Sequence, residues 1–104
     1  MNILSEQIRA FTAKLNEILT ERRSITSTDP NNPEVKDLEY KVSMTVLDVA
    51  TFYADSKDTG GTIDEIVEAE MFESVRNAIS SYVDVAERQR VQKLFQSIAK
   101  IALT

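Results

Sequence analysis

The densest group of side chains that could do chemistry is a run of carboxylates in the second half of the chain: Asp64, Glu65, Glu68, Glu70 and Glu73. Asp64 and Glu68 are four residues apart, so on a helix their carboxylates share one face, where they could bind a hard cation or act as general acid and base. Acids near a helix N-terminus also complement the helix dipole, and such a run is typical of a solvated face. We therefore predict a structural role for these carboxylates and no metal site.

Other catalytic residue types are missing. The sequence has no histidine and no cysteine, which removes the usual general base, the nucleophilic triads and the thiolate metal ligands. The two glycines, Gly60 and Gly61, lack the spacing and the lysine of a phosphate-binding loop. We predict that the protein is not an enzyme and uses no cofactor.

A cluster of basic residues lies near the C-terminus. Residues 62–83 contain five acids and one base, for a net charge of −4, whereas residues 84–104 contain two acids and four bases, for +2. The four bases are Arg88, Arg90, Lys93 and Lys100. They are either ordinary surface charge or a docking face for an acidic partner or the inner membrane surface. The whole chain carries −5, which argues against nonspecific nucleic-acid binding because phosphate requires a basic footprint.

Apolar periodicity predicts the helices that must position these residues. In the segment Ile3 to Arg23, apolar residues recur at intervals of four and three, which is the pattern of one helix packing along another. A second helix is expected from Pro33 to about Ser56, with Asn32 as its cap. Together they predict two long helices joined by the polar stretch 24–32.

Two further helices are expected in the second half; because no glycine or proline enforces a break near Ser80 to Asp84, a single long helix is the alternative. Gly60-Gly61 should end the second helix, and Thr62 with Glu65 reads as a capping box that starts the third. Asp84 with Glu87 reads as another capping box, and the fourth helix should run nearly to Thr104. The expected buried positions of these two helices are Ile63, Val67, Met71, Val75, Ile79 and Tyr82 in the third, and Val91, Leu94, Phe95, Ile98, Ile101 and Ala102 in the fourth.

These segments predict an all-α protein. The 104 residues suit a single domain spanning residues 1–104. Four amphipathic helices with short connections favour an antiparallel up-and-down four-helix bundle. The absence of cysteine, of a signal-peptide pattern and of an apolar run of about 20 residues is consistent with a cytoplasmic location and no transmembrane segment.

The second helix has two apolar arcs. Opposite its main stripe lie Tyr40, Met44, Leu47 and Ala54. A helix that is apolar most of the way round is usually surrounded by neighbours. Met44 and Leu47 therefore either contact further helices of the same chain or meet another protein, and the protein is a monomer or a homodimer accordingly.

The chain resembles the immunity proteins of pediocin-like bacteriocins, the enterocin A immunity group. A glycine pair precedes the sequence I-D-E-I-V at Ile63 to Val67, and V-Q-K-L-F-Q-S-I-A-K-I-A at Val91 to Ala102 looks like the closing helix of that family. The resemblance implies a cytosolic four-helix bundle that engages a membrane transporter occupied by a bacteriocin. It also implies that the fourth helix supplies the contacts.

Two other interpretations remain open. One is a helical assembly protein of phage or plasmid origin, in which Met44 and Leu47 form a symmetric interface. The other is an acidic inhibitor that mimics nucleic acid with the carboxylates of the third helix, Glu68 and Glu73 among them.

Overall fold

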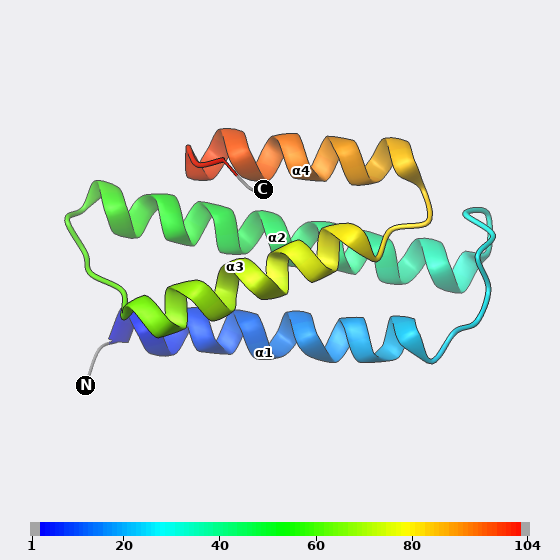
Figure 1. Ribbon diagram of the computed structural model, residues 1–104, viewed down its shortest axis with the longest axis horizontal. Coiled ribbons are helices and arrows are strands. Elements are labelled where there is room, and N and C mark those ends of the chain that lie inside the picture. Colours follow the sequence, from blue (N-terminus) through cyan, green and yellow to red (C-terminus); the bar gives the residue numbers. More distant parts are fainter. Residues whose placement is uncertain (1–2, 103–104) are drawn as a thin grey trace.

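The computed structural model describes residues 3–102, and these form four helices with no strand among them. The helices are α1 (Ile3–Arg23), α2 (Pro33–Asp58), α3 (Glu65–Ser80) and α4 (Val85–Ala99) (Figure 1). The all-α class is confirmed, and α3 and α4 are separate helices.

The first two helices closely follow their predictions. The bounds of α1 match the predicted ones, and its seam buries Ile8, Leu15 and Ile18. At the start of α2, the Asn32 side chain accepts hydrogen bonds from the backbone N–H groups of Glu34 and Val35, and Pro33 occupies the first turn. The helix continues two residues beyond the predicted end, to Asp58.

The turn between α2 and α3 differs from its prediction. Gly60 has φ +75° and supplies the left-handed conformation after the helix, but Gly61 has no such angle. The predicted capping box at Thr62 and Glu65 is wrong, because the N-cap is Asp64, whose carboxylate accepts from the N–H groups of Ile66 and Val67. The chain stays non-helical through Ile63, which lets that side chain enter the core.

The last helix starts where predicted and ends early. Asp84 is its N-cap and accepts from the N–H of Glu87. The helix stops at Ala99 because Lys100 adopts the left-handed conformation with φ 55°. The predicted end near Thr104 is therefore wrong for residues 100–102, Ala102 is exposed rather than buried, and residues 103–104 lie outside the described part.

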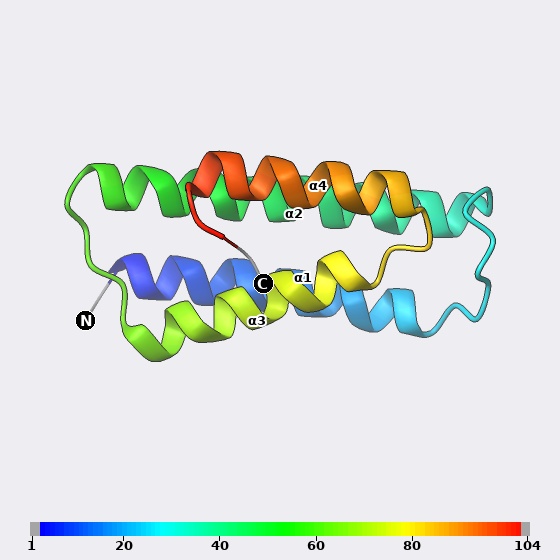
Figure 2. The same ribbon diagram turned by 45° about the horizontal axis from the view of Figure 1, so that its top comes forward.

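The helices form two layers (Figure 2). In one layer α1 lies beside α3, and in the other α2 lies beside α4, while α1 also packs on α2 across the layers. Within residues 3–102, α1 and α4 make no close approach, and α2 meets α3 only weakly. The segment 59–64 therefore crosses from one layer to the diagonally placed helix of the other, so that helices consecutive in sequence are not always the closest in space.

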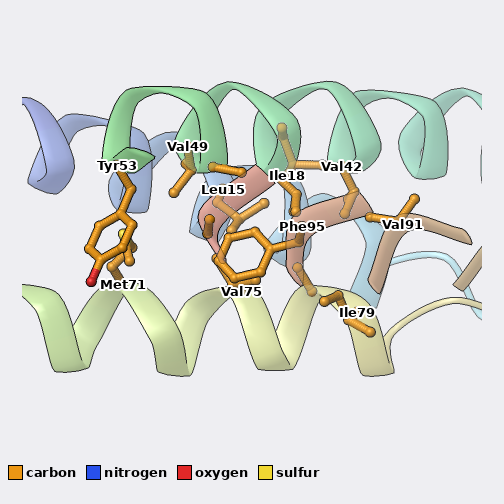
Figure 3. Packing of buried hydrophobic residues seen from close by; sticks show 14 of the residues in the cluster. Leu15, Ile18, Val42, Val49, Tyr53, Met71, Val75, Ile79, Val91 and Phe95 are labelled. Atoms are coloured by element: carbon orange, nitrogen blue, oxygen red, sulfur yellow. The ribbon is translucent and has the colours of Figure 1, made fainter. Parts of the chain in front are cut away.

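One cluster of buried side chains draws on all four helices (Figure 3). All six predicted positions from Ile63 to Tyr82 are buried, as are Val91 and Phe95 of α4, whereas Leu94, Ile98 and Ile101 are half-buried. The ring of Phe95 meets Phe72 of α3 edge to face at 6.4 Å between centroids. Phe95 thus connects α4 to α3, although the two helix backbones lie far apart for most of their length.

None of the helices within residues 3–102 combines the length and the apolar character that crossing a membrane requires.

Candidate partner-binding surfaces

The predicted contact residues separate into two surfaces. We call Arg90 and Lys93 of α4, together with Lys100 directly after the end of that helix, the basic face. All three are exposed, and Arg90 and Lys93 lie three residues apart on one side of α4. Arg88, which was predicted to belong with them, is half-buried and lies on another side of α4. Met44 and Leu47 belong to α2 and form part of the second surface.

Only part of the basic face is neutralised within the chain. Arg90 donates through Nε to Oε2 of Glu87 at 2.9 Å, and a second bond joins its Nη2 to Oε1 of the same carboxylate. The hydrogen bond from Arg90 holds the pKa of Glu87 below its ordinary value. Lys93 and Lys100 have no ion-pair partner among residues 3–102, so their charges are available to a partner.

The second surface is an exposed apolar strip on α2. We call Tyr40, Met44 and Leu47 the outer α2 face; Tyr40 is 64% exposed, Met44 is 49% exposed and Leu47 is half-buried. Met44 therefore lies outside the core. Tyr40 was not among the predicted contacts, although its place in the second apolar arc was the signal that could have identified it.

A buried polar network, which sequence analysis missed, holds the start of α4 against α2. The Glu39 side chain is buried, and its Oε2 accepts from the backbone N–H of Val83 at 2.8 Å. The hydroxyls of Ser43 and Tyr82 lie 2.5 Å apart, and Tyr82 also lies within donating distance of the Glu39 carbonyl, at 3.1 Å. Because a buried polar group without a partner is costly, this network fixes where α4, and hence the basic face, begins relative to α2.

The network makes the protein sensitive to alkaline pH. Burial raises the pKa of Tyr82 to about 12, from 10.0 in the unfolded chain. The neutral phenol is thus favoured by folding, and its contribution to stability is complete below pH 10.0 and is lost as the pH rises through about 12.

We expect Tyr82→Phe to lower the free energy of unfolding by about 0.5–1.5 kcal/mol at neutral pH, because its hydrogen bonds are lost. The variant should also lose less stability than the wild type when urea unfolding, followed by circular dichroism, is repeated from about pH 8 to about pH 11. Tyr53→Phe is a second test of the same effect, since burial also raises the pKa of Tyr53 to about 12, and this variant should likewise lose less stability at alkaline pH; its hydroxyl donates elsewhere, to Glu68. If the free energy of unfolding of Tyr82→Phe and of the wild type fell equally with rising pH, the raised pKa of Tyr82 would be contradicted.

Two of the five predicted carboxylates, Asp64 and Glu68, have structural partners. Asp64 caps the helix, and Glu68 pairs with Lys57 of α2 at 3.3 Å while accepting from the Tyr53 hydroxyl at 3.2 Å. Within residues 3–102 no group of three or more Asp or Glu side chains is placed to hold a metal ion. Glu68 is therefore engaged inside the fold, which weakens its use as a free carboxylate in a nucleic-acid mimic.

No family model, curated protein or solved structure matches this chain. The basic face and the outer α2 face are therefore the features from which a function can be argued.

Proposed function

We propose that this protein is a non-enzymatic binding protein whose basic face docks on an acidic surface of another protein. The observation that carries the proposal is the pair Lys93 and Lys100, two exposed cations with no counter-ion among residues 3–102, in a chain of net charge −5. A local patch of sign opposite to the whole molecule orients the protein toward an acidic partner and raises the rate of productive encounter.

The scaffold of this proposal is an antiparallel up-and-down four-helix bundle. It is supported by the course of the chain in Figures 1 and 2, where α1 and α2 are drawn in opposite directions. The Glu39–Val83 and Ser43–Glu87 contacts advance in the same direction along α2 and α4. Alternation of successive helices requires this common direction of the second and fourth helix, although here the two pack side by side. The basic face then lies on an outer side of α4, away from Val91 and Phe95.

The resemblance to immunity proteins of pediocin-like bacteriocins supplies the partner class. We infer a cytoplasmic protein that engages a membrane transporter complex occupied by a bacteriocin from the cytosolic side. Of the residues that carry the resemblance, Ile63, Val67, Val91 and Phe95 are buried and therefore support the fold. Lys93 on α4 and Lys100 directly after it are exposed and would contact the transporter.

The test is expression in cells that are sensitive to pediocin-like bacteriocins. We expect the wild type to raise the bacteriocin concentration needed to kill, and the double variant Lys93→Glu/Lys100→Glu to abolish this protection. Reversing both charges against an acidic surface should cost at least about 1.4 kcal/mol each, or on the order of 100-fold in affinity.

The control is Lys14→Glu/Lys36→Glu, which changes the net charge equally at two exposed lysines outside α4 and should retain protection. Circular dichroism would establish that both double variants fold. Full protection by the α4 double variant would eliminate the basic face as the docking site, and absence of protection by the wild type against several such bacteriocins would eliminate the immunity function.

A further inference from the structure

The outer α2 face has a second property, which does not depend on the basic face: it is complementary to itself. Tyr40, Met44 and Leu47 are spaced by four and three residues along the longest helix of the protein. Two opposite charges border them, Lys41 and Asp48, both exposed. Met44 lies almost midway between these charges in the sequence.

Helix geometry places these four neighbours in two matched pairs around Met44. Successive residues advance by about 100° and about 1.5 Å. Lys41 and Asp48 therefore lie on one side of Met44, at about 60° and about 40° around the axis, with Lys41 before and Asp48 after it. Tyr40 and Leu47 lie on the other side, at about 40° and about 60°, again one before and one after.

We propose that a second copy of this chain packs antiparallel on the outer α2 face, about a two-fold axis that passes close to Met44. This rotation reverses the direction of the second helix, and it brings the charged side of one copy against the charged side of the other and the apolar side against the apolar side. It places Lys41 opposite Asp48 of the second copy, Tyr40 opposite Leu47 of the second copy, and the two Met44 side chains against each other. Each unlike pair occurs twice, as an isologous interface requires.

Internal partners do not compete strongly for these charges. Asp48 has no ion pair or hydrogen bond through its carboxylate within residues 3–102. Lys41 pairs with Asp37 at 3.2 Å, but both side chains are at least half exposed, and such a pair contributes little.

Charge complementarity also selects the orientation. In a parallel pair the charged side of one copy would lie against the apolar side of the other. Both Lys41 and Asp48 would then face apolar side chains. Only the antiparallel arrangement joins opposite charges and apolar groups together. An interface of one helix face on each copy is small, so the dimer should form in a concentration-dependent manner.

The experiment is a concentration series measured by size-exclusion chromatography with light scattering. We expect the mass of the wild type to rise from 11.7 kDa, the mass of one chain, toward twice that value. Lys41→Asp and Asp48→Lys should each raise the dissociation constant by on the order of tenfold or more, because each variant faces itself with like charges.

Two rescues identify the register. The double variant Lys41→Asp/Asp48→Lys restores both pairs with their signs exchanged and should dimerise like the wild type. An equal mixture of the two single variants should also dimerise, because one carries two cations and the other two anions at these positions. Lys14→Asp, a charge change on α1, is the control and should leave the dissociation constant unchanged.

The proposal is overturned if the wild-type mass stays at 11.7 kDa up to a protein concentration of about 1 mM. A dimer with a dissociation constant below about 1 mM would raise the mass at that concentration. A wild-type dimer that neither the double variant nor the mixture reproduces also overturns the proposal, since that result places the interface elsewhere on the molecule.

Discussion

Replacing Phe95 with alanine is expected to remove about 3–5 kcal/mol from the free energy of unfolding. Phe95 is fully buried, and Figure 3 places it at the centre of the core cluster, among residues of α2 and α3. The loss combines the transfer free energy of the ring with the cost of the cavity that remains. A domain of this size is stable by only about 5–15 kcal/mol, so the variant should lose a large part of its total stability.

The expected effect is large also because of how α4 is held. This helix packs closely on α2 and makes no close approach to α1 within residues 3–102. The Phe95–Phe72 ring pair is part of its contact with α3, so we expect truncation at Phe95 to loosen α4 from the α1–α3 layer. We therefore expect the basic face to lose its fixed position in the same variant.

Thermal unfolding followed by circular dichroism measures the effect, with an expected fall in Tm of about 15–30 °C. Phe52→Ala is the matched control, because Phe52 is only partly buried and pairs with the equally peripheral Phe11 at 5.6 Å. The control should lose clearly less stability. Equal losses of stability for the two variants would contradict the view that Phe95 contributes more to the core than a partly buried phenylalanine.

The second large effect is expected from Gly61→Ala. A Cβ atom built on Gly61 would overlap the Cδ1 methyl of Leu4 and would lie 2.8 Å from the carbonyl oxygen of Ser56. The methyl belongs to a flexible side chain, but the carbonyl is backbone and accepts the hydrogen bond from the Gly61 N–H at 2.7 Å. Since relief requires movement of the end of α2, we expect a loss of about 2–3 kcal/mol, at the upper end of the range for overpacking.

Gly60→Ala provides the comparison at the adjacent position. Gly60 has φ +75° and no atom within 4 Å of an added Cβ, so its cost is the left-handed strain alone, about 1–2 kcal/mol. Urea unfolding should give a lower free energy of unfolding for Gly61→Ala than for Gly60→Ala. The reverse order would mean that the backbone around Ser56 yields easily, and that positive φ is the dominant requirement in this turn.

Several features of the protein were predictable because their causes are local. The bounds of α1 follow from an apolar period that continues without interruption, and the start of α2 follows from Asn32 and Pro33, which act within one turn of themselves. The buried positions of α3 follow from the same period. The grouping of Arg90 with Lys93 on one side of α4 follows from helical spacing alone.

Other features depend on contacts between distant segments, and only the tertiary structure decided them. Whether Met44 was core or surface depended on which helices flank α2, and the structure places α1 and α4 there, leaving one side uncovered. The N-cap of α3 is Asp64 and not the predicted Thr62, because Ile63 enters the core and the Asp64 N–H donates to Ser5 of α1.

The same reason applies to Glu39 and Gly61. No local pattern distinguishes Glu39 from the solvated acids, yet it is buried because its carboxylate meets the N–H of Val83, 44 residues away. The space around Gly61 is closed by the Ser56 carbonyl of α2 and also by Leu4, which lies near the start of α1 and far away in the sequence. The sequence by itself determined the helices through interactions within a turn or two, whereas the pairing of helices determined which side chains remain free to bind a partner.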